Sequence, residues 1–243
     1  MMAIVLVSGG LDSVVTLYYL KKIRKLLNLK IIFFDYIQRD LKEEIFCVDK
    51  LSKILRIPVE YVDFRFLNKF STSLINNNKK IPKTSSNNLK NVKQGRKEII
   101  NWWVPARNSL FLLTALAFAE SNYIKKGVKE DIYLGLKNEG RVPMKDTTKE
   151  FIKKINELVY YSINSGSFKF KAPLINYDKD EIVKLGSKLK APFEYTFSCY
   201  ISSGFKKVNG KKIPVHCGYC ESCMQRKKAF YWANIKDPSI YLK

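Results

Sequence analysis

The chain has 243 residues, of which 46% are hydrophobic, so it can bury a full core and suits one α/β domain with a small appendage. Its longest apolar run, at residues 110–119, falls short of the roughly 18 residues that span a bilayer, and no basic segment precedes the apolar N-terminus as in a signal peptide. We therefore expect a cytoplasmic protein without a membrane span.

The net charge of +22 is compatible with nucleic-acid binding, because clustered cations displace counterions from phosphate backbones. Only eight of the 44 cationic residues are arginine, however, and the lysines are spread along the chain. This favours a solvated lysine surface over a dedicated nucleic-acid-binding module, and such a surface also attracts ATP and other anions.

Residues 4–13 read Ile-Val-Leu-Val-Ser-Gly-Gly-Leu-Asp-Ser and predict a strand, a tight loop and a helix that continues to about residue 27. Glycine lets the backbone approach a ligand closely, and the N–H groups of a new helix attract an anion. Ser8 and Ser13 add hydroxyl donors, and Asp12 suits a magnesium ion or a helix cap. The stretch resembles the PP-loop of the ATP pyrophosphatase superfamily and lacks the Gly-Lys-Ser/Thr ending of a Walker A loop.

The next segments predict more of a parallel sheet. Residues 30–36 and 58–62 have the composition of strands, and residues 41–55 have the spacing of an amphipathic helix. Open α/β sheets bind ligands at the carboxyl ends of their strands. Three polar residues follow the strand at residues 30–36 in this way: Asp35, Tyr36 and Gln38.

Residues 68–101 are rich in Ser, Asn and Lys and predict a flexible insertion, which either closes over the site as a lid or is a surface loop. Order returns at Trp102-Trp103-Val104-Pro105-Ala106-Arg107-Asn108, and helical spacing follows over residues 109–119, with Asn108 or Ser109 as the cap. Arg107 then lies at a helix start, where it could bind a phosphate or carboxylate, or pair with a surface acid.

The second half predicts further α/β elements. They are a strand at residues 131–135, a polar loop at 137–146, a helix at 147–161 and an alternating segment at 168–174 that stops at Pro173. Asp178-Lys179-Asp180-Glu181 is a capping box that starts another helix. Lys179, in its first turn, is placed to reach a phosphate or to stay in solvent.

Four cysteines predict a metal site: Cys199, Cys217, Cys220 and Cys223. The last three are separated by two residues each, so a tight turn can present their thiolates to one ion, and four sulfurs complete a tetrahedral structural zinc site. An iron–sulfur cluster is the alternative. Asn209-Gly210, between the first two cysteines, suits a two-residue hairpin turn. Cys47, on the helix at residues 41–55, is expected to be a small core residue, and His216 a bystander.

The fold expected from these elements is an open, mostly parallel α/β sheet with helices on both faces, of the PP-loop or adenine nucleotide alpha hydrolase type. Residues 1–198 would form the ATP-binding domain. Residues 199–243 would form a small four-cysteine zinc knuckle packed on the same domain.

Together the motifs resemble the QueC family of 7-cyano-7-deazaguanine synthases over nearly the whole chain. The matching stretches are residues 8–13, Phe34-Asp35-Tyr36 with Gln38, Val104-Pro105-Ala106-Arg107-Asn108, Ala172-Pro173-Leu174, Lys179 with Glu181-Ile182, Ser198-Cys199-Tyr200, residues 217–223, and Arg226 with Ala229-Phe230. A PP-loop combined with a four-cysteine site is far more specific than either part.

The resemblance implies a ligase that converts 7-carboxy-7-deazaguanine and ammonia to the nitrile, through an adenylated carboxylate and then an adenylated amide, for queuosine or archaeosine synthesis. It implies ATP, Mg²⁺ and Zn²⁺ as cofactors, a homodimer, and neither membrane nor nucleic-acid partners. The implied catalytic residues are Asp12, Arg107 and Lys179, and the implied metal ligands are the four cysteines. The implied nucleotide contacts are Val7, Ser8, Gly9, Gly10, Leu11, Asp12, Ser13, Val14, Val15, Thr16, Leu17, Asp35 and Tyr36. The implied substrate contacts are Gln38, Arg107, Asn108 and Asp146.

The chain departs from the family pattern at three places. Ile37 stands in a Tyr-Ile-Gln stretch where the family has Tyr-Gly-Gln, and Met144-Lys145-Asp146-Thr147 replaces Tyr-Pro-Asp-Cys on the substrate side. The segment between Cys199 and Cys217 is also longer than usual. A related enzyme that adenylates another carboxylate, or joins a deazapurine to another amine, is therefore the leading rival. A PP-loop enzyme that modifies tRNA, or a zinc nucleic-acid-binding module, is the next.

Overall fold

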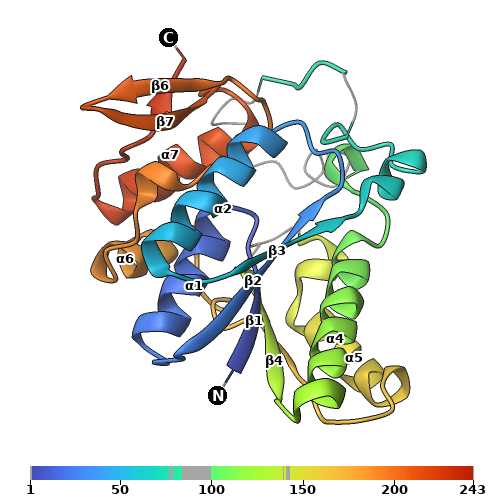
Figure 1. Cartoon of the computed structure of the whole chain (residues 1–243). Helices are drawn as coiled ribbons and strands as arrows, with labels where there is room; N and C mark the ends of the chain where they lie inside the picture. Colours follow the sequence, from blue (N-terminus) through green and yellow to red (C-terminus); the bar gives the residue numbers. More distant parts are fainter. Residues whose placement is uncertain (1, 77–78, 84–99, 139, 141–142, 243) are drawn as a thin grey trace.

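The computed structural model describes residues 2–76, 79–83, 100–138, 140 and 143–242. Five parallel strands form the main sheet in the order β3-β2-β1-β4-β5 (Figure 1). The strands are β1 (Met2–Leu6), β2 (Asn28–Asp35), β3 (Val59–Asp63), β4 (Glu130–Leu134) and β5 (Phe170–Lys171). Strand order reverses between β1 and β4, so the carboxyl ends of these two strands border the crevice where such sheets bind ligands.

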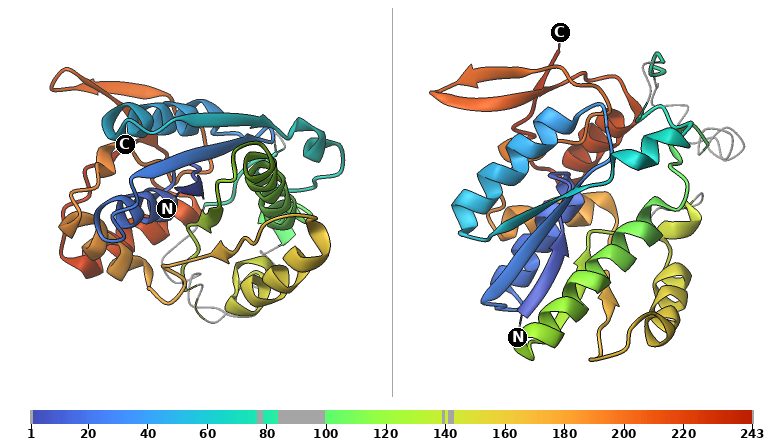
Figure 2. Two further views of the ribbon diagram at one scale, coloured as in Figure 1. Left: turned by 60° about the horizontal axis from the view of Figure 1, so that its bottom comes forward. Right: turned by 45° about the vertical axis from the view of Figure 1, so that its right-hand side comes forward.

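Helices cover both faces of this sheet, as predicted. On one side lie α1 (Leu11–Lys22), α2 (Leu41–Leu55), α6 (Lys179–Lys188) and α7 (Glu221–Ala233), and on the other α4 (Arg107–Lys126) and α5 (Lys149–Ser162) (Figures 1 and 2). Side chains alternate across a strand. In β1, Ala3 and Val5 therefore pack towards α1 and α2, whereas Ile4 packs towards α4 and α5. Burial on both faces explains why β1 is continuously apolar.

The C-terminal region adds a small second sheet. It comprises β6 (Phe205–Val208), β7 (Lys211–His216) and β8 (Ile240–Tyr241). The hairpin between β6 and β7 turns at Asn209 and Gly210, whose φ angles are +49° and +74°. Positive φ at both positions is what a two-residue hairpin turn requires, so the predicted turn is confirmed.

Two helices differ from the predicted boundaries. The first ends at Lys22, not near residue 27, because the chain reverses at Lys25, which has a φ of +51°, and enters β2 at Asn28. The α4 helix extends on both sides of residues 109–119. Its cap is Ala106, in the left-handed region and without a side-chain cap bond, so the prediction of Asn108 or Ser109 as the cap was wrong.

Further elements follow the sequence with smaller shifts. The α2 helix has the predicted bounds, and the predicted capping box of α6 forms between Asp178 and Glu181. The predicted helix at residues 147–161 divides into a 3₁₀ turn, Lys145–Thr147, and α5, which Thr148 caps by accepting the N–H of Phe151. Two more 3₁₀ turns lie at Arg65–Lys69 and Phe193–Tyr195.

Much of the predicted flexible insertion at residues 68–101 lies outside the described residues. The side-chain amide of Asn76, in its first described part, donates to the backbone oxygen of Tyr36 at 2.6 Å. Leu74 N–H donates to the backbone oxygen of Asn101 at 2.8 Å, which joins the two described ends of the insertion. Among the helices of the described residues, none combines the length and apolarity needed to cross a bilayer.

Candidate functional site

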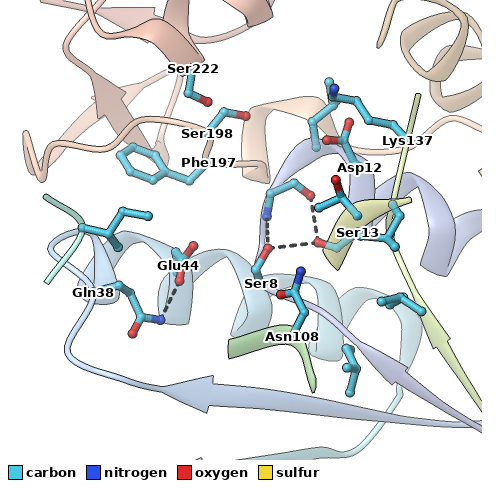
Figure 3. Close-up of a pocket in the computed structure, with 18 of the residues that line it drawn as sticks. Ser8, Asp12, Ser13, Gln38, Glu44, Asn108, Lys137, Phe197, Ser198 and Ser222 are labelled. Atoms are coloured by element: carbon cyan, nitrogen blue, oxygen red, sulfur yellow. Dashed lines mark hydrogen bonds between the residues drawn. The ribbon is translucent and has the colours of Figure 1, made fainter. Parts of the chain in front are cut away.

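A cavity of about 1000 Å³ opens at the carboxyl ends of β1 and β4. Its walls come from the loop after β1, the ends of β2 and β4, the start of α4, residues 197–200 and the first turns of α7. Segments from the beginning and the end of the chain therefore meet around one space (Figure 3).

The loop after β1 forms one wall through hydroxyl groups and the start of α1. The Ser8 and Ser13 hydroxyls lie 3.4 Å apart, Ser8 accepts Gly10 N–H at 3.3 Å, and Ser13 donates to the backbone oxygen of Gly10 at 3.0 Å (Figure 3). Gly9 has a φ of +77°, and a Cβ there would lie 3.1 Å from the backbone oxygen of Glu44. The loop thus holds the shape expected for an anion site at a helix start.

Asp12 lies in the first turn of α1, facing the cavity. Its Oδ2 pairs with Lys179 Nζ at 3.3 Å, which brings the start of α6 to the same place. Its Oδ1 is buried and has no hydrogen-bond partner within the described residues. A hard divalent cation prefers carboxylate oxygens of this kind, so the site fits a magnesium ion.

Gly135, directly after β4, allows the sheet to approach this loop. A Cβ at Gly135 would lie 2.6 Å from Ser13 Cα and 2.7 Å from Ser13 N. No side chain fits at that distance, so the contact between β4 and α1 depends on glycine.

The start of α4 lines the cavity with Arg107 and Asn108. Arg107 donates to the hydroxyl of Tyr36 at 3.4 Å and to Asn108 Oδ1 at 3.3 Å, and its guanidinium lies over the Tyr36 ring. Burial raises the pKa of Tyr36, so its phenol keeps its proton. Asn108 also donates to the backbone oxygen of Asp146 at 3.2 Å, which fixes the amide beside the cavity.

The four predicted cysteines come together in the structure. All four are buried, and their sulfur atoms lie within 4.8 Å of one another, with 3.9 Å between Cys217 and Cys223 and between Cys199 and Cys220. A metal–sulfur bond of about 2.3 Å in a tetrahedron places sulfurs about 3.8 Å apart. The group therefore fits one tetrahedral ion better than a cluster of several metal atoms.

Backbone N–H groups surround these sulfurs. Ile201 and Cys217 donate to Cys199 Sγ, each at 3.3 Å, and Tyr219 and Cys220 donate to Cys217 Sγ at 3.5 and 3.3 Å. Such donors stabilise thiolates, the form that binds a metal.

The cysteine group supports one wall of the cavity. Trp102, Phe197 and Tyr200 pack around it and also line the cavity, and the Trp102 and Tyr200 rings stack with centroids 4.4 Å apart. Phe197 N–H donates to the backbone oxygen of Gly9 at 2.9 Å. Phe197 thus connects the loop after β1 with the cysteine group.

The remaining predicted residues divide into those that line the cavity and those that do not. Val7, Leu11, Tyr36 and Gln38 line it. Gly9, Val14, Val15, Thr16, Leu17, Asp35 and Asp146 are not among the lining residues. Val14, Val15 and Leu17 are fully buried core residues that anchor α1, because a helix presents only one face to the cavity.

Cys47 and His216 lie outside the metal group. Cys47 is buried, and burial raises the pKa of its thiol, which agrees with a core residue. The ring of His216 is buried and its Nε2 accepts the N–H of Ser198 at 3.3 Å, so it supports the cavity wall and lies outside the four-cysteine group.

Several lining residues were not predicted. Polar residues among them include Glu44, Lys137, Ser198, Ser222, Gln225 and Lys228. The last three are spaced three residues apart, so the helix α7 places them on one face. They could be found only after α7 had been recognised as a wall of the cavity. Glu44 stands six residues after Gln38, in the first turn of α2.

The chain matches a known family and named relatives over its length. The model of the family described as queuosine biosynthesis protein QueC matches residues 2–234. A 7-cyano-7-deazaguanine synthase of Methanococcus maripaludis is 38% identical, over 100% of this chain and 99% of that protein. Another of Methanobrevibacter smithii is 37% identical, over 98% and 97%. A solved 4-thiouridine synthetase–RNA complex with bound ATP is a distant likeness, with 18% identity, a TM-score of 0.47, and 78% of this chain and 41% of that chain covered.

Proposed function

The chain belongs to the QueC family, and from this premise we propose that it is a 7-cyano-7-deazaguanine synthase. Its substrates are then ATP, ammonia and 7-carboxy-7-deazaguanine, and its product is the nitrile. The observation that carries the proposal is the single cavity in which a PP-loop faces a wall built on four cysteines.

The PP-loop end of the cavity suits the nucleotide. The start of α1, with Ser8, Gly10 and Ser13, offers donors to the phosphates, and Lys179 adds a cation. Asp12 would hold Mg²⁺, which supplies charge neutralisation to the phosphates when bound. Donors fixed in place before the reaction stabilise the charge that develops on the leaving pyrophosphate, which is the main source of catalysis here.

A second group of lining residues suits the deazapurine acid. Arg107 offers a guanidinium to the carboxylate, Asn108 an amide, and Trp102 with Tyr200 a flat aromatic wall. Asp146 acts indirectly, through its backbone bond to Asn108. Gln38 uses both amide hydrogens within the chain, so its role is to hold the loop after β2.

The chemistry proceeds in two activated steps. The acid attacks the α-phosphorus of ATP and gives an acyl adenylate with release of pyrophosphate, and ammonia then displaces AMP to form the amide. A second ATP activates the amide oxygen, and loss of AMP leaves the nitrile. The four cysteines would hold Zn²⁺, a closed structural site with no open position for water, which shapes the substrate wall.

The proposal also covers the domain boundaries, the cellular location and the oligomeric state. Residues 1–198 form the ATP-binding domain and residues 199–243 the metal-binding segment packed on it. The cysteines of the described chain form no disulfide, which suits the reducing cytoplasm. We propose a homodimer as in the family, which size-exclusion chromatography with light scattering would test.

The decisive experiment follows both base and nucleotide products by mass spectrometry. The purified protein is incubated with ATP, magnesium, ammonia and 7-carboxy-7-deazaguanine. The expected result is the nitrile, with AMP and pyrophosphate. ATP turnover with an unchanged base would overturn the proposed substrate and favour the rival that uses another acid or amine. Salt-dependent tRNA affinity without ATP turnover would instead favour the nucleic-acid-binding module.

A further inference from the structure

Glu44 is one of the acidic residues that line the cavity and have no part in the reaction as described so far. The residue is 9% exposed and lines the cavity from the first turn of α2, beside the PP-loop (Figure 3). Acidic side chains are rarely buried without a partner of opposite charge, so its presence there needs an explanation.

The carboxyl is held in one orientation by neutral groups. Its Oε2 accepts a hydrogen bond from Gln38 Nε2 at 2.7 Å. Gln38 is fixed in turn, because the same nitrogen donates to the backbone oxygen of Phe34 at 3.1 Å and Oε1 accepts Tyr36 N–H at 3.0 Å. Across the part of the chain that the structure describes, no lysine or arginine forms an ion pair with Glu44.

The charged and titratable neighbours of Glu44 come from three elements. Asp40, Glu43 and Cys47 belong to α2 or its cap, Tyr36 follows β2, and Arg107 starts α4. Burial, followed by the Asp40 carboxyl, raises the pKa of Glu44 well above its usual range, while Gln38 and Arg107 act in the opposite direction. A carboxylate in this setting is a stronger base than one in water.

The proposed reaction needs such a base. Ammonia is present at neutral pH mainly as ammonium, which has no lone pair and must lose a proton before it can attack. After the attack, the nitrogen bound to the acyl carbon carries three protons, one more than the amide product, so a second proton must be removed. Among the acidic groups described above, Asp40 and Glu44 both line the cavity, and neither forms an ion pair within the described residues. Of the two, Glu44 is the one whose backbone lies against Gly9 of the PP-loop.

We propose that Glu44 is a catalytic residue of amide formation, and that its carboxylate binds the incoming ammonium ion and accepts the protons that the nitrogen loses. The inference rests on the proposed function. The carboxylate takes a proton from ammonium and passes it to water. The nitrogen lone pair then forms the C–N bond to the acyl carbon, the C–O bond breaks, and its electron pair leaves with AMP. The excess proton on the nitrogen passes to the same carboxylate.

The test is the variant Glu44→Gln, which keeps the size and the hydrogen bond to Gln38 but cannot take a proton. Adenylation of the acid without ammonia is measured as exchange of labelled pyrophosphate into ATP, and we expect it to stay within about twofold of the wild type. The kcat for amide formation with ammonia should fall by roughly 100-fold or more, the usual contribution of a general base. Hydroxylamine, which is largely unprotonated at neutral pH, should show a much smaller loss.

The pH profile separates this role from a structural one. In the wild type, amide formation should rise with pH to a plateau as Glu44 loses its proton. In Glu44→Gln it should keep rising with the fraction of free ammonia. The matched control is Glu43→Gln. Glu43 is buried on the same helix but accepts Ser202 Oγ and Gly204 N–H at 2.7 and 2.9 Å outside the cavity lining. Because its charge contributes to the raised pKa of Glu44, this variant should keep a rise to a plateau, shifted at most to lower pH.

Two results would overturn the inference. Equal losses in pyrophosphate exchange and amide formation would show that Glu44 only holds the loop, and an unchanged pH profile in Glu44→Gln would show that another group takes the protons. Absence of acid-dependent pyrophosphate exchange in the wild type would be a failure of the proposed function itself.

Discussion

Asp12 divides its two carboxylate oxygens between a cation of the chain and the cavity. Oδ2 pairs with Lys179, whereas the buried Oδ1 has no hydrogen-bond partner within the described residues. We predict that Asp12→Ala, and the isosteric Asp12→Asn, lower ATP turnover by at least 100-fold because both remove the negatively charged oxygens that bind Mg²⁺. The melting temperature should change by no more than about 2 °C, since the pair with Lys179 is partly exposed. An Asp12→Ala enzyme that still hydrolyses ATP would contradict the role of the PP-loop.

Gly135 sets the distance between β4 and the start of α1. A methyl group at this position would overlap the backbone of Ser13, so Gly135→Ala must push the PP-loop away from the sheet. We predict a loss of about 1–3 kcal/mol in the free energy of unfolding, as in other overpacked sites, together with weaker ATP binding. Urea unfolding and calorimetric titration with ATP measure the two effects. Wild-type affinity for ATP in a destabilised variant would show that the loop tolerates the shift.

At the scale of elements, the helix α7 links metal binding to the cavity. Its cap is Cys220, and its first turn carries both Cys223 and Ser222. We predict that Cys220→Ala loses the metal and the folded C-terminal segment together, because the binding free energy of a structural metal contributes directly to folding. The matched variant Cys47→Ala should keep its full metal content. Elemental analysis and thermal unfolding distinguish them. Metal loss from Cys47→Ala, or full metal in Cys220→Ala, would contradict this ligand set.

The start of α2 makes the stability depend on pH. Burial raises the folded-state pKa of Asp40 and Glu44 above their unfolded values. Below about pH 4 these carboxyls are protonated in both the folded and the unfolded chain, and the folded state carries no cost for burying their charge. As pH rises towards their folded-state pKa values, the unfolded chain loses these protons first, so the free energy of unfolding falls. We predict that Glu44→Gln flattens the fall in melting temperature between pH 4 and 8. A fall as steep as in the wild type would show that Glu44 ionises freely in the fold.

Short sequence patterns predicted the helices and strands whose formation depends on neighbouring residues in the chain. The alternating and apolar runs gave the strands of the sheet, and the capping box gave the start of α6. The end of α1 was missed because Lys25 reverses the chain without glycine, and the cap of α4 because Ala106 takes a left-handed conformation that its side chain does not favour.

The same distinction holds for the candidate site. The PP-loop and the four cysteines could be found because their chemistry is encoded in short spacings. Glu44, Ser222 and Lys228 could not, because they reach the cavity only once α2 and α7 have packed around it. From the sequence alone, an acid in the first turn of a helix is explained by its interaction with the helix dipole, and only the tertiary structure shows that it lines a cavity.

At the scale of the molecule, the net charge of +22 acts on every anionic substrate. We predict that the association rate constant of ATP falls roughly tenfold from low to high salt, because screening removes long-range steering. Stopped-flow binding of a fluorescent ATP analogue measures it. Replacing Lys206 and Lys207, on the exposed β6–β7 hairpin, by glutamine should lower the low-salt rate without changing kcat. A rate constant independent of salt would show that the field does not reach the cavity.

The bond from Phe197 N–H to Gly9 joins two parts of the chain that leave the ribosome far apart in time. The PP-loop is translated well before residues 197–228, which form the wall that faces it. A nascent chain that stops before this wall has a nucleotide loop with no closed cavity around it. A chain that stops before residue 197 therefore lacks the enclosure needed to adenylate an acid, so ATP use depends on residues 197–228 having been made.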